Sequence, residues 1–287
     1  MIKKCVFCNN DYEVTRGCVL KKRKYCSKVC HDNYWLKKGN KSGKFMGDKL
    51  AQGKTIKLTQ TLSDFQKQFI VGTLLGDSNV GLSRKGSPNL RFQHTKKNFD
   101  YVLVKTEILK NFIILEKPTL YPPRESYLNG VIVKTKASYT SQTVTHQDLK
   151  QYDTLFYTRI KDKRTKVFNE KLINLITPVS LIFWYMDDGT LSKNHNFINL
   201  STNCFSYKDH LKILRLFNEK FNLKPKIYFI KIQKNYYTRF NKEDVSKLMS
   251  LFEPLKQYIP PSMFYKFTFL SQPVVNPTHP QLIAVRL

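Results

Sequence analysis

The sequence predicts an α+β protein in which one module occurs twice along the chain. Two apolar helical segments each run directly into acidic residues, the first over Phe69–Asp77 and the second over Leu181–Gly189. The stretches that follow them repeat the same order of strands, a helix, further strands and a closing helix. Each repeat is therefore expected to have an αββαββα order.

The two apolar segments carry the signals that start and stop helices. Ser63 precedes Gln66 by three residues, which is the capping-box pattern. Thr177 followed by Pro178 places a cap and a first-turn proline before the second segment. Gly189 stands where the second helix would end. Both segments are thus predicted to be helices with defined ends.

Each predicted helix directs a carboxylate off its C-terminal end, Asp77 in the first and Asp188 in the second. That end of a helix already carries roughly half a negative charge, so an acidic residue there is disfavoured. Either residue alone could be an ordinary turn aspartate. The occurrence of both in corresponding places instead favours a cation that is shared by the two helix ends.

The expected elements of the two repeats correspond one to one. In the first repeat they are a strand at Asn89–Thr95, a helix at Asp100–Leu115, strands near Gly130–Lys136 and Tyr139–Thr145, and a helix near Asp148–Tyr157. In the second repeat they are a strand at Ile198–Asn203, a helix at Tyr207–Phe221, strands at Ile227–Gln233 and Tyr236–Phe240, and a helix at Lys242–Leu255.

Four cysteines near the N-terminus form a C-x2-C and a C-x3-C pair at the two ends of one basic loop: Cys5, Cys8, Cys26 and Cys30. This spacing predicts a small zinc ribbon, in which the metal supplies the folding energy of a segment too short for its own core. Cys18 is expected to be a spectator, and His31 is an alternative ligand. A disulfide scaffold or free thiols is the competing interpretation, and the absence of a secretion signal counts against disulfides.

The charge balance indicates a polyanionic partner. The chain has 287 residues, with 49 Lys and Arg against 21 Asp and Glu, and a formal net charge of +28. Nucleic acid is the usual polyanion that such a charge serves. A membrane surface is the alternative, but no long basic amphipathic helix supports it. With no run of eighteen apolar residues and no signal start, the protein is expected to be soluble and intracellular.

The sequence divides into five predicted regions. These are a zinc ribbon in residues 1–36, a glycine-broken basic linker in 37–60, a first repeat in 61–165, a second repeat in 166–270 and a C-terminal tail in 271–287.

The predicted strands present polar side chains on one face. Along Ile227–Gln233, Ile230 and Ile232 are expected to pack inward, while their neighbours point outward. A polar, basic sheet face can lie in the DNA major groove, where long side chains reach base edges. A plain solvated face is the alternative. The residues expected to contact DNA are Arg91, Lys134, Lys136, Gln142, Lys231, Lys234 and Arg239.

Residues 63–267 resemble the LAGLIDADG homing endonucleases, in the single-chain, two-repeat type encoded by introns of organelles, including yeast mitochondria, and of phages. Three segments carry the resemblance: Gly72-Thr73-Leu74-Leu75-Gly76-Asp77, Trp184-Tyr185-Met186-Asp187-Asp188-Gly189 and Ile259-Pro260-Pro261-Ser262-Met263-Phe264-Tyr265-Lys266. The first segment alone would be weak evidence. The second, correctly spaced from it and followed by the third, is specific.

The resemblance implies two pseudo-symmetric halves that form a DNA-binding saddle, with the motif helices side by side at its centre. Asp77 and Asp188 would then be the ligands of catalytic Mg²⁺ or Mn²⁺, whereas Asp187 stands at a position that is not usually a ligand. Gly72 and Gly76, four residues apart, would let the first helix approach the bulkier second helix closely.

The resemblance also implies further active-site residues. Lys266 aligns with the family's lysine of the second half. Lys166 is the chosen counterpart in the first half, although Lys163 and Lys171 lie close enough in sequence to compete. The polar residues that organise active-site water are expected at Gln93 and Gln233.

The implied activity is site-specific, metal-dependent cleavage of both strands of a long DNA target, leaving short 3′ overhangs. The partner would be double-stranded DNA, and host intron RNA is a further candidate. The enzyme is expected to act as a monomer in an organelle matrix or a bacterial or phage-infected cytoplasm. The alternatives are a group I intron RNA maturase and a catalytically silent DNA-binding regulator.

Overall fold

The computed structural model describes residues 2–14, 24–27, 29–30, 60–82, 86–113, 115, 117–128, 131–161 and 163–268. The chain divides into two compact units, residues 1–59 and residues 60–287. In the first unit β1 (Ile2–Lys4) and β2 (Asp11–Glu13) form an antiparallel pair. Most of the predicted basic linker and the whole predicted tail lie outside the described residues.

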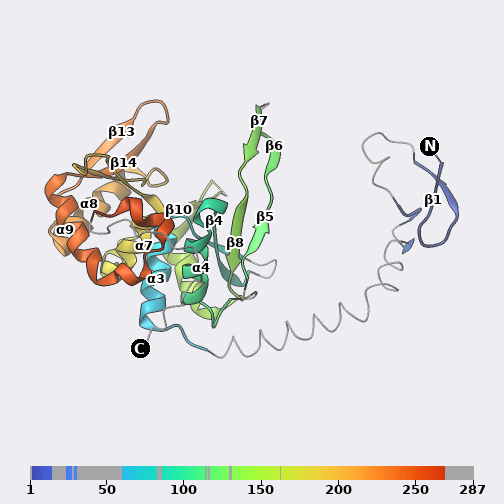
Figure 1. Cartoon of the computed structure of the whole chain (residues 1–287), viewed down its shortest axis with the longest axis horizontal. Coiled ribbons are helices and arrows are strands. Elements are labelled where there is room, and N and C mark those ends of the chain that lie inside the picture. Colours follow the sequence, from blue (N-terminus) through green and yellow to red (C-terminus); the bar gives the residue numbers. More distant parts are fainter. Residues whose placement is uncertain are drawn as a thin grey trace. The chain divides into compact units, whose positions relative to one another are not determined.

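Two helices form the centre of the second unit, α3 (Asp64–Leu75) and α7 (Pro178–Asp188) (Figure 1). The predicted capping box is present, since the Gln66 amide donates to Ser63 Oγ (3.2 Å) and the Ser63 amide donates to Gln66 Oε1 (3.0 Å). Thr177 caps α7 through its hydroxyl, and Gly189 follows the last helical residue. The predicted starts of both helices are confirmed.

The two central helices approach each other closely at glycine. A Cβ atom on Gly72 would overlap the backbone of Ser180 in α7, so only glycine fits there. The Ser180 hydroxyl donates to the Gln68 carbonyl of α3 (2.9 Å), and the Thr177 hydroxyl donates to Gln68 Oε1 (2.7 Å). The close approach expected of the first motif is confirmed.

A four-stranded antiparallel sheet follows each central helix, and the two sheets have the same strand order. The first is ordered β3 (Asn79–Leu82), β4 (Pro88–Thr95), β8 (Ser138–Gln142) and β5 (Thr119–Tyr121). The second is ordered β11 (Gly189–Leu191), β12 (Ile198–Leu200), β14 (Asn235–Phe240) and β13 (Lys226–Ile230). The predicted duplicated α+β fold is therefore confirmed.

The remaining helices complete the two repeats. They are α4 (Phe99–Ile108) and α5 (Lys150–Phe156) in the first, and α8 (Tyr207–Phe221) and α9 (Lys242–Phe252) in the second, with a short α6 (Leu172–Leu175) between them. Short 3₁₀ turns cover Lys96–Asn98, Gln147–Leu149, Glu253–Tyr258 and Pro261–Lys266. No helix among the described residues is both long and apolar enough to cross a bilayer.

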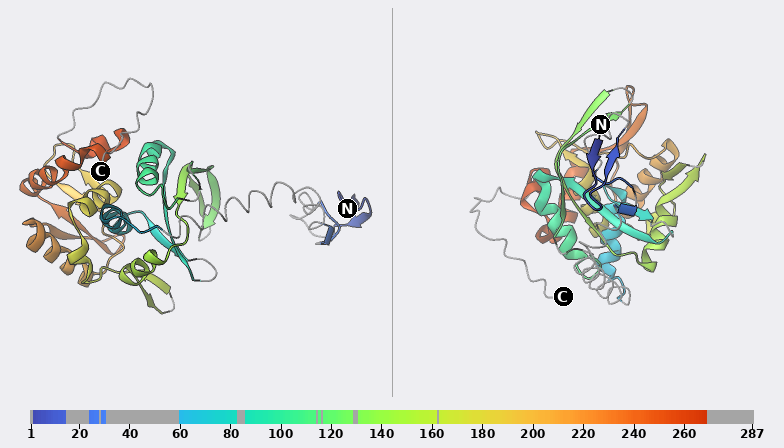
Figure 2. Two further views of the ribbon diagram at one scale, coloured as in Figure 1. Left: turned by 90° about the horizontal axis from the view of Figure 1, so that it is seen from below. Right: turned by 90° about the vertical axis from the view of Figure 1, so that its right-hand side faces the viewer.

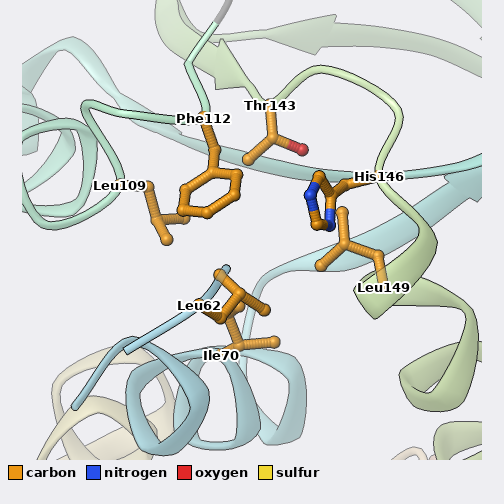
Figure 3. A pocket seen from close by; sticks show the side chains of 7 residues that line it. All are labelled: Leu62, Ile70, Leu109, Phe112, Thr143, His146 and Leu149. Carbon is orange, nitrogen blue, oxygen red and sulfur yellow. The ribbon is translucent and has the colours of Figure 1, made fainter. Parts of the chain in front are cut away.

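Helix α4 ends at Ile108, seven residues before the predicted end. Beyond it, Ile113 forms a β-bridge with Thr143, and the Val144 amide donates to the Phe112 carbonyl (2.7 Å). Phe112 and Thr143 line a small, mostly apolar pocket with Leu62, Ile70, Leu109, His146 and Leu149 (Figure 3). Residues 109–113 therefore adopt the conformation that this pairing and packing require, and the helix predicted from the sequence pattern does not continue through them.

The strand expected near Gly130–Lys136 is present, but the other three short strands described next were not predicted. β6 (Arg124–Leu128) and β7 (Val131–Thr135) form a two-stranded ribbon that rises beside the first sheet (Figure 1). β9 (Tyr157–Ile160) and β10 (Lys163–Lys166) form a hairpin whose turn projects from this unit (Figure 2). The strand predicted near Tyr139–Thr145 ends early, at Gln142, and Thr143, Val144 and His146 beyond it are all buried.

The hairpin of the second sheet is also shorter than predicted. β13 ends at Ile230, and residues 231–234 form the turn to β14, with Lys234 in the left-handed region (φ 53°). Ile232 is 95% exposed at this turn, so its predicted inward packing is wrong.

Candidate active site

The carboxylates of Asp77 and Asp188 lie at the C-terminal ends of the two central helices. Asp77 follows the end of α3 with about half of its side chain exposed, and Asp188 is the last residue of α7. Burial, and then the Asp77 and Asp187 charges, raise the pKa of Asp188 to about 8. Burial and Asp187 raise the pKa of Asp77 to about 6. A divalent cation fits this oxygen donor set and would relieve the crowding of negative charge.

A lysine caps the last carbonyls of each central helix, half-buried in the case of Lys166 and buried in the case of Lys266. Lys166 Nζ donates to the carbonyl oxygens of Leu75 (3.0 Å) and Gly76 (2.9 Å). Lys266 Nζ donates to the carbonyl oxygen of Met186 (2.6 Å), which occupies the corresponding place in α7. Burial lowers the pKa of both ammonium groups. The two lysines are thus related by the same pseudo-symmetry as the helices.

The two competing lysines lie elsewhere. Lys163 is exposed at the start of β10, and Lys171 is the residue before α6. Neither makes the carbonyl contacts described for Lys166, so the placement favours Lys166 as the counterpart of Lys266.

A fully buried carboxylate, that of Asp187, lies beneath Asp77. Lys105 Nζ donates to Asp187 Oδ1 (2.7 Å) and Oδ2 (3.0 Å), and the Asp77 amide donates to Oδ2 (3.2 Å). Burial alone would raise the pKa of Asp187, but the Lys105 ammonium outweighs it and lowers that pKa. His94 Nδ1 lies 3.7 Å from Asp77 Oδ2, and His94 Nε2 lies 3.7 Å from Asp187 Oδ1.

The side chains of Asp77, His94 and Asp187 could together offer three ligand atoms to one ion, because these atoms lie within 4.8 Å of one another. The Lys105 ammonium already neutralises Asp187, however, and a cation at that carboxylate would be repelled by it. Burial, and then Lys105, lower the pKa of His94 to about 3, so its ring is neutral at pH 7. These charges disfavour Asp187 as a ligand, although it lies in the geometric cluster with Asp77, and Asp77 and Asp188 remain the predicted ligands.

Lys105 and His94 were not among the predicted site residues, although the sequence contains a signal for each. Lys105 lies four residues after Tyr101 and four before Leu109, within the buried stripe of α4. His94 follows Phe92 by two residues and shares its inward face on β4. A charged or titratable residue on an inward face requires a buried partner.

The outward faces of the two sheets carry the expected polar side chains near the active site. On the first sheet Arg91 of β4 lies directly opposite Gln142 of β8. On the second sheet Arg239 of β14 lies opposite Asn199 of β12, and its Nε donates to Asn199 Oδ1 (2.8 Å). The Arg239 guanidinium carbon also lies 4.3 Å from the centre of the Phe197 ring. These paired polar groups suit base contacts in a groove.

The other expected DNA-contacting residues lie farther along the hairpins. Lys134 is on β7, where it pairs with Glu125 (3.0 Å), and Lys136 is exposed just after that strand. Lys231 and Lys234 belong to the turn between β13 and β14.

The two glutamines predicted to organise water occupy different places. Continuing the register of β3 with β4 places Gln93 opposite Asp77, and Gln93 Nε2 donates to Ser138 Oγ (2.6 Å). Gln233 instead lies in the turn after β13, so its predicted place on a strand is wrong. In the second repeat the residue opposite Asp188 is Ser201, whose amide donates to the Asp188 carbonyl (3.0 Å).

The four N-terminal cysteines cluster in the first unit. One ligand atom from each lies within 4.8 Å of the others: Cys5, Cys8, Cys26 and Cys30. Cys8 Sγ lies 3.6 Å and Cys30 Sγ 3.4 Å from Cys26 Sγ, and all four are free thiols. Four thiolates at this spacing fit one tetrahedral zinc ion. Cys18 and His31 lie outside the described residues.

The chain is similar to several intron-encoded proteins and to a homing endonuclease of known structure. A "Probable intron-encoded endonuclease 1" from Wickerhamomyces canadensis is 29% identical over 73% of this chain and 86% of its own length. A "Cytochrome b mRNA maturase bI2" from Saccharomyces cerevisiae is 30% identical over 69% of this chain, but only 46% of its own length is matched. The structure of "The homing endonuclease I-WcaI bound to its DNA recognition sequence" superposes with a TM-score of 0.62 and 28% identity, covering 75% of this chain and 91% of that chain.

Residues 67–248 match the family described as the LAGLIDADG DNA endonuclease family, and this span contains most of α3, all of α7 and both sheets. The motif helices, the duplicated sheets and this match lead to one conclusion: the chain belongs to the LAGLIDADG DNA endonuclease family.

Proposed function

We propose that the protein is a site-specific homing endonuclease that makes metal-dependent double-strand breaks in a long DNA target, leaving short 3′ overhangs. The observation that carries the proposal is the pairing of Asp77 and Asp188 at the ends of adjacent helices, each helix end capped by a lysine. The similarity to intron-encoded endonucleases and to a DNA-bound homing endonuclease supports it.

In this mechanism Asp77 and Asp188 would hold Mg²⁺ or Mn²⁺. When bound, such ions activate water and stabilise the charge that develops on the phosphate. Lys166 and Lys266 keep a positive charge beside each carboxylate, where it can stabilise the anionic phosphate during attack. Gln93 lies opposite Asp77 with a carboxamide that can orient water in the first half.

The two sheets would bind double-stranded DNA through their outward faces. Arg91 with Gln142, and Arg239 with Asn199, provide donor and acceptor groups for base edges. Because one chain contains both repeats and both carboxylates, a monomer would suffice to cut both strands.

The N-terminal unit would bind one zinc ion and add DNA affinity without taking part in the chemistry. Its four clustered cysteine side chains support the zinc site, and its excess of lysine and arginine supports the contact with DNA.

The proposal is tested by replacing each carboxylate. Asp77→Asn and Asp188→Asn should each abolish cleavage of both strands of the DNA that flanks the gene's own insertion site, while binding of that DNA is largely retained. Asp64→Asn, at the exposed opposite end of α3, is the matched control and should cut like the wild type. Full activity in either active-site variant would contradict the shared metal assignment.

The similarity to a yeast mRNA maturase motivates a second candidate function, assistance of group I intron splicing. It can be tested by measuring whether the protein accelerates splicing of its host intron RNA in the presence of Mg²⁺. Splicing that persists in Asp77→Asn would show that the two activities are separable.

A further inference from the structure

Asp187 breaks the symmetry between the two central helices. The corresponding residue of α3 is Gly76, and a Cβ atom there would overlap the side chain of Asp187. The glycine of one helix thus makes room for the carboxylate of the other. As a result, α7 inserts an acidic side chain beneath the active-site turn that belongs to α3.

Lys105 donates to both oxygens of the Asp187 carboxylate, and Oδ2 has further partners. Oδ1 accepts the shorter hydrogen bond from the Lys105 ammonium (2.7 Å). Oδ2 accepts from the Asp77 amide (3.2 Å) and from the Thr73 hydroxyl (3.3 Å). The carboxylate therefore bridges a buried cation and the backbone of a predicted metal ligand.

The same network holds the turn on both sides of Asp77. Lys105 Nζ also donates to Thr73 Oγ1 (2.8 Å), and the Thr73 hydroxyl lies 2.5 Å from that of Ser78. Thr73 and Ser78 are both buried, and the Ser78 amide donates to the Thr73 carbonyl (3.0 Å). The residues before and after Asp77 are thus connected to Asp187 through hydroxyl groups.

Stability alone does not explain a buried ion pair of this kind. The desolvation of two charges commonly cancels their attraction, and apolar pairs of similar volume are often at least as stable. A buried pair is better explained where it fixes the geometry of a neighbouring group. Here that group is the Asp77 backbone, which lies at the surface end of the network.

We propose that Asp187 is a positioning residue for the first active site: it fixes the Asp77 backbone through the amide hydrogen bond and is itself held by Lys105. This inference rests on the proposed metal-binding function of Asp77. Since α3 presents Gly76 at the equivalent position, the device serves one of the two active sites. Cleavage of one DNA strand should therefore depend on this network more strongly than cleavage of the other strand.

Two double variants separate positioning from stability. Asp187→Leu with Lys105→Met replaces the ion pair by an apolar pair of similar shape and removes the acceptor for the Asp77 amide. Asp187→Asn with Lys105→Met is also uncharged, but its side-chain carbonyl can still accept that hydrogen bond. Both should fold and bind the target DNA, because neither changes an outward-facing residue of the sheets.

The expected results differ between these variants. The Leu/Met variant should cut on the order of a hundredfold more slowly, because small misplacements of reacting groups have effects of this size. Nicked DNA should accumulate, since one strand is slowed more than the other. In the metal-free protein, the Asp77 amide should exchange with D₂O at least about tenfold faster by ¹⁵N NMR, as expected when its hydrogen bond opens. The Asn/Met variant should stay near the wild type in both measurements.

The single variant Asp187→Asn gives an independent test if the apolar pair does not fold. With Lys105 present, the Asn carbonyl turns toward the ammonium and its NH₂ group faces the Asp77 amide, so two donors meet. This variant should therefore be impaired, and adding Lys105→Met should rescue it. A buried acid remote from the site, Asp244, accepts the Lys224 amide (3.1 Å), and Asp244→Asn is the structural control that should not favour one strand.

Wild-type rates on both strands for the Leu/Met variant, or unchanged exchange of the Asp77 amide, would overturn the inference. Failure of the proposed function is distinguishable, because it would appear as full cleavage by Asp77→Asn. The amide exchange of the metal-free protein reports on positioning regardless of that result.

Discussion

Two lysine side chains donate to the last carbonyl groups of the two central helices. The last four carbonyls of a helix have no partner within the helix, and they carry its negative partial charge. Lys166 and Lys266 supply donors and a positive charge at these ends. The positive charge of each lysine therefore offsets two negative charges, that of the helix end and that of the adjacent carboxylate. No direct salt bridge between the lysine and the carboxylate is needed for this.

Lys266→Met and Lys166→Met should each slow cleavage by on the order of a hundredfold, or about 2–4 kcal/mol in transition-state free energy, because each removes a charge beside the phosphate. DNA affinity should fall far less, since one contact among many is lost. The two variants should slow opposite strands, which is measured by single-turnover cleavage of DNA labelled on either strand. Equal slowing of both strands would contradict the assignment.

A matched control exists for these lysines. Lys220 Nζ also donates to two carbonyls at a helix end, those of Ile173 (3.1 Å) and Asn174 (2.9 Å), but at α6. Lys220→Met therefore removes the same kind of contact outside the active site. It should leave both strand rates unchanged even if it lowers stability.

Some site residues could be predicted from the sequence because their chemistry is local. Asp77 and Asp188 follow directly from apolar helices that they terminate, so a short motif identifies them. The partner of Asp187, Lys105, lies 82 residues away and in another helix. Gln233 was misplaced for a related reason, since only the tertiary register shows that Ser201 lies opposite Asp188.

At the scale of elements, the contact between α3 and α7 depends on small residues. Gly72 faces the backbone of Ser180, which cannot move without moving α7. Gly76 faces the side chain of Asp187. The packing of these helices therefore controls both the stability of the core and the separation of the two carboxylates.

Gly72→Ala should destabilise the protein by about 1–3 kcal/mol, the range observed for overpacked cores. It should also slow cleavage, because the helices and their carboxylates move apart. Urea denaturation measures the first effect and strand-specific cleavage the second. Gly81→Ala on β3 is the control: its Cβ would meet only the amide end of Asn89, which can rotate away, so stability should change little. A Gly72→Ala variant as stable as the wild type would contradict the close packing.

His210 makes the stability of the second repeat depend on pH. It is fully buried on α8, with Nδ1 bonded to the Ser206 carbonyl (2.9 Å) and Nε2 to Thr202 Oγ1 (2.8 Å). Burial lowers its pKa, so the folded protein binds this proton less tightly than the unfolded chain does. Its contribution is present above the ordinary histidine pKa, about 6.5, and is lost as the pH falls below it.

The melting temperature should therefore drop between pH 7 and pH 5, and His210→Gln should reduce that drop. Comparing the two proteins across this range isolates His210 from the other histidines. An identical pH dependence in both would show that His210 does not contribute to it.

The strands that the sequence did not predict are short or lack a buried face. β5 has only three residues, and β9 and β10 form a polar hairpin with no buried face. Such strands are held by backbone pairing and leave little periodicity in the sequence. The motif helices have strong caps and long apolar faces, so their positions were predictable.

At the scale of the whole molecule, the positive charge is shared between the two units. Residues 1–59 contain fifteen basic and four acidic side chains, so they carry eleven of the 28 net positive charges. The carboxylates and lysines of the candidate active site all belong to residues 60–287. We therefore expect affinity to draw on both units and the chemistry to depend on the second alone.

A protein that begins at Gln60 should cut the same phosphates as the full chain but require a higher concentration to do so. Each phosphate contact contributes about 0.9 to the slope of log K against log salt for B-DNA, so the truncated protein should show a shallower slope. Removing zinc from the full chain with a chelator should shift affinity in the same direction, because the cysteine cluster loses its folding energy. Binding measured at several salt concentrations, with cleavage measured at saturating protein, separates the two contributions. If the truncated protein folds but cannot cut even at saturation, the first unit takes part in catalysis; if its salt slope is unchanged, the positive charges of residues 1–59 do not contact DNA.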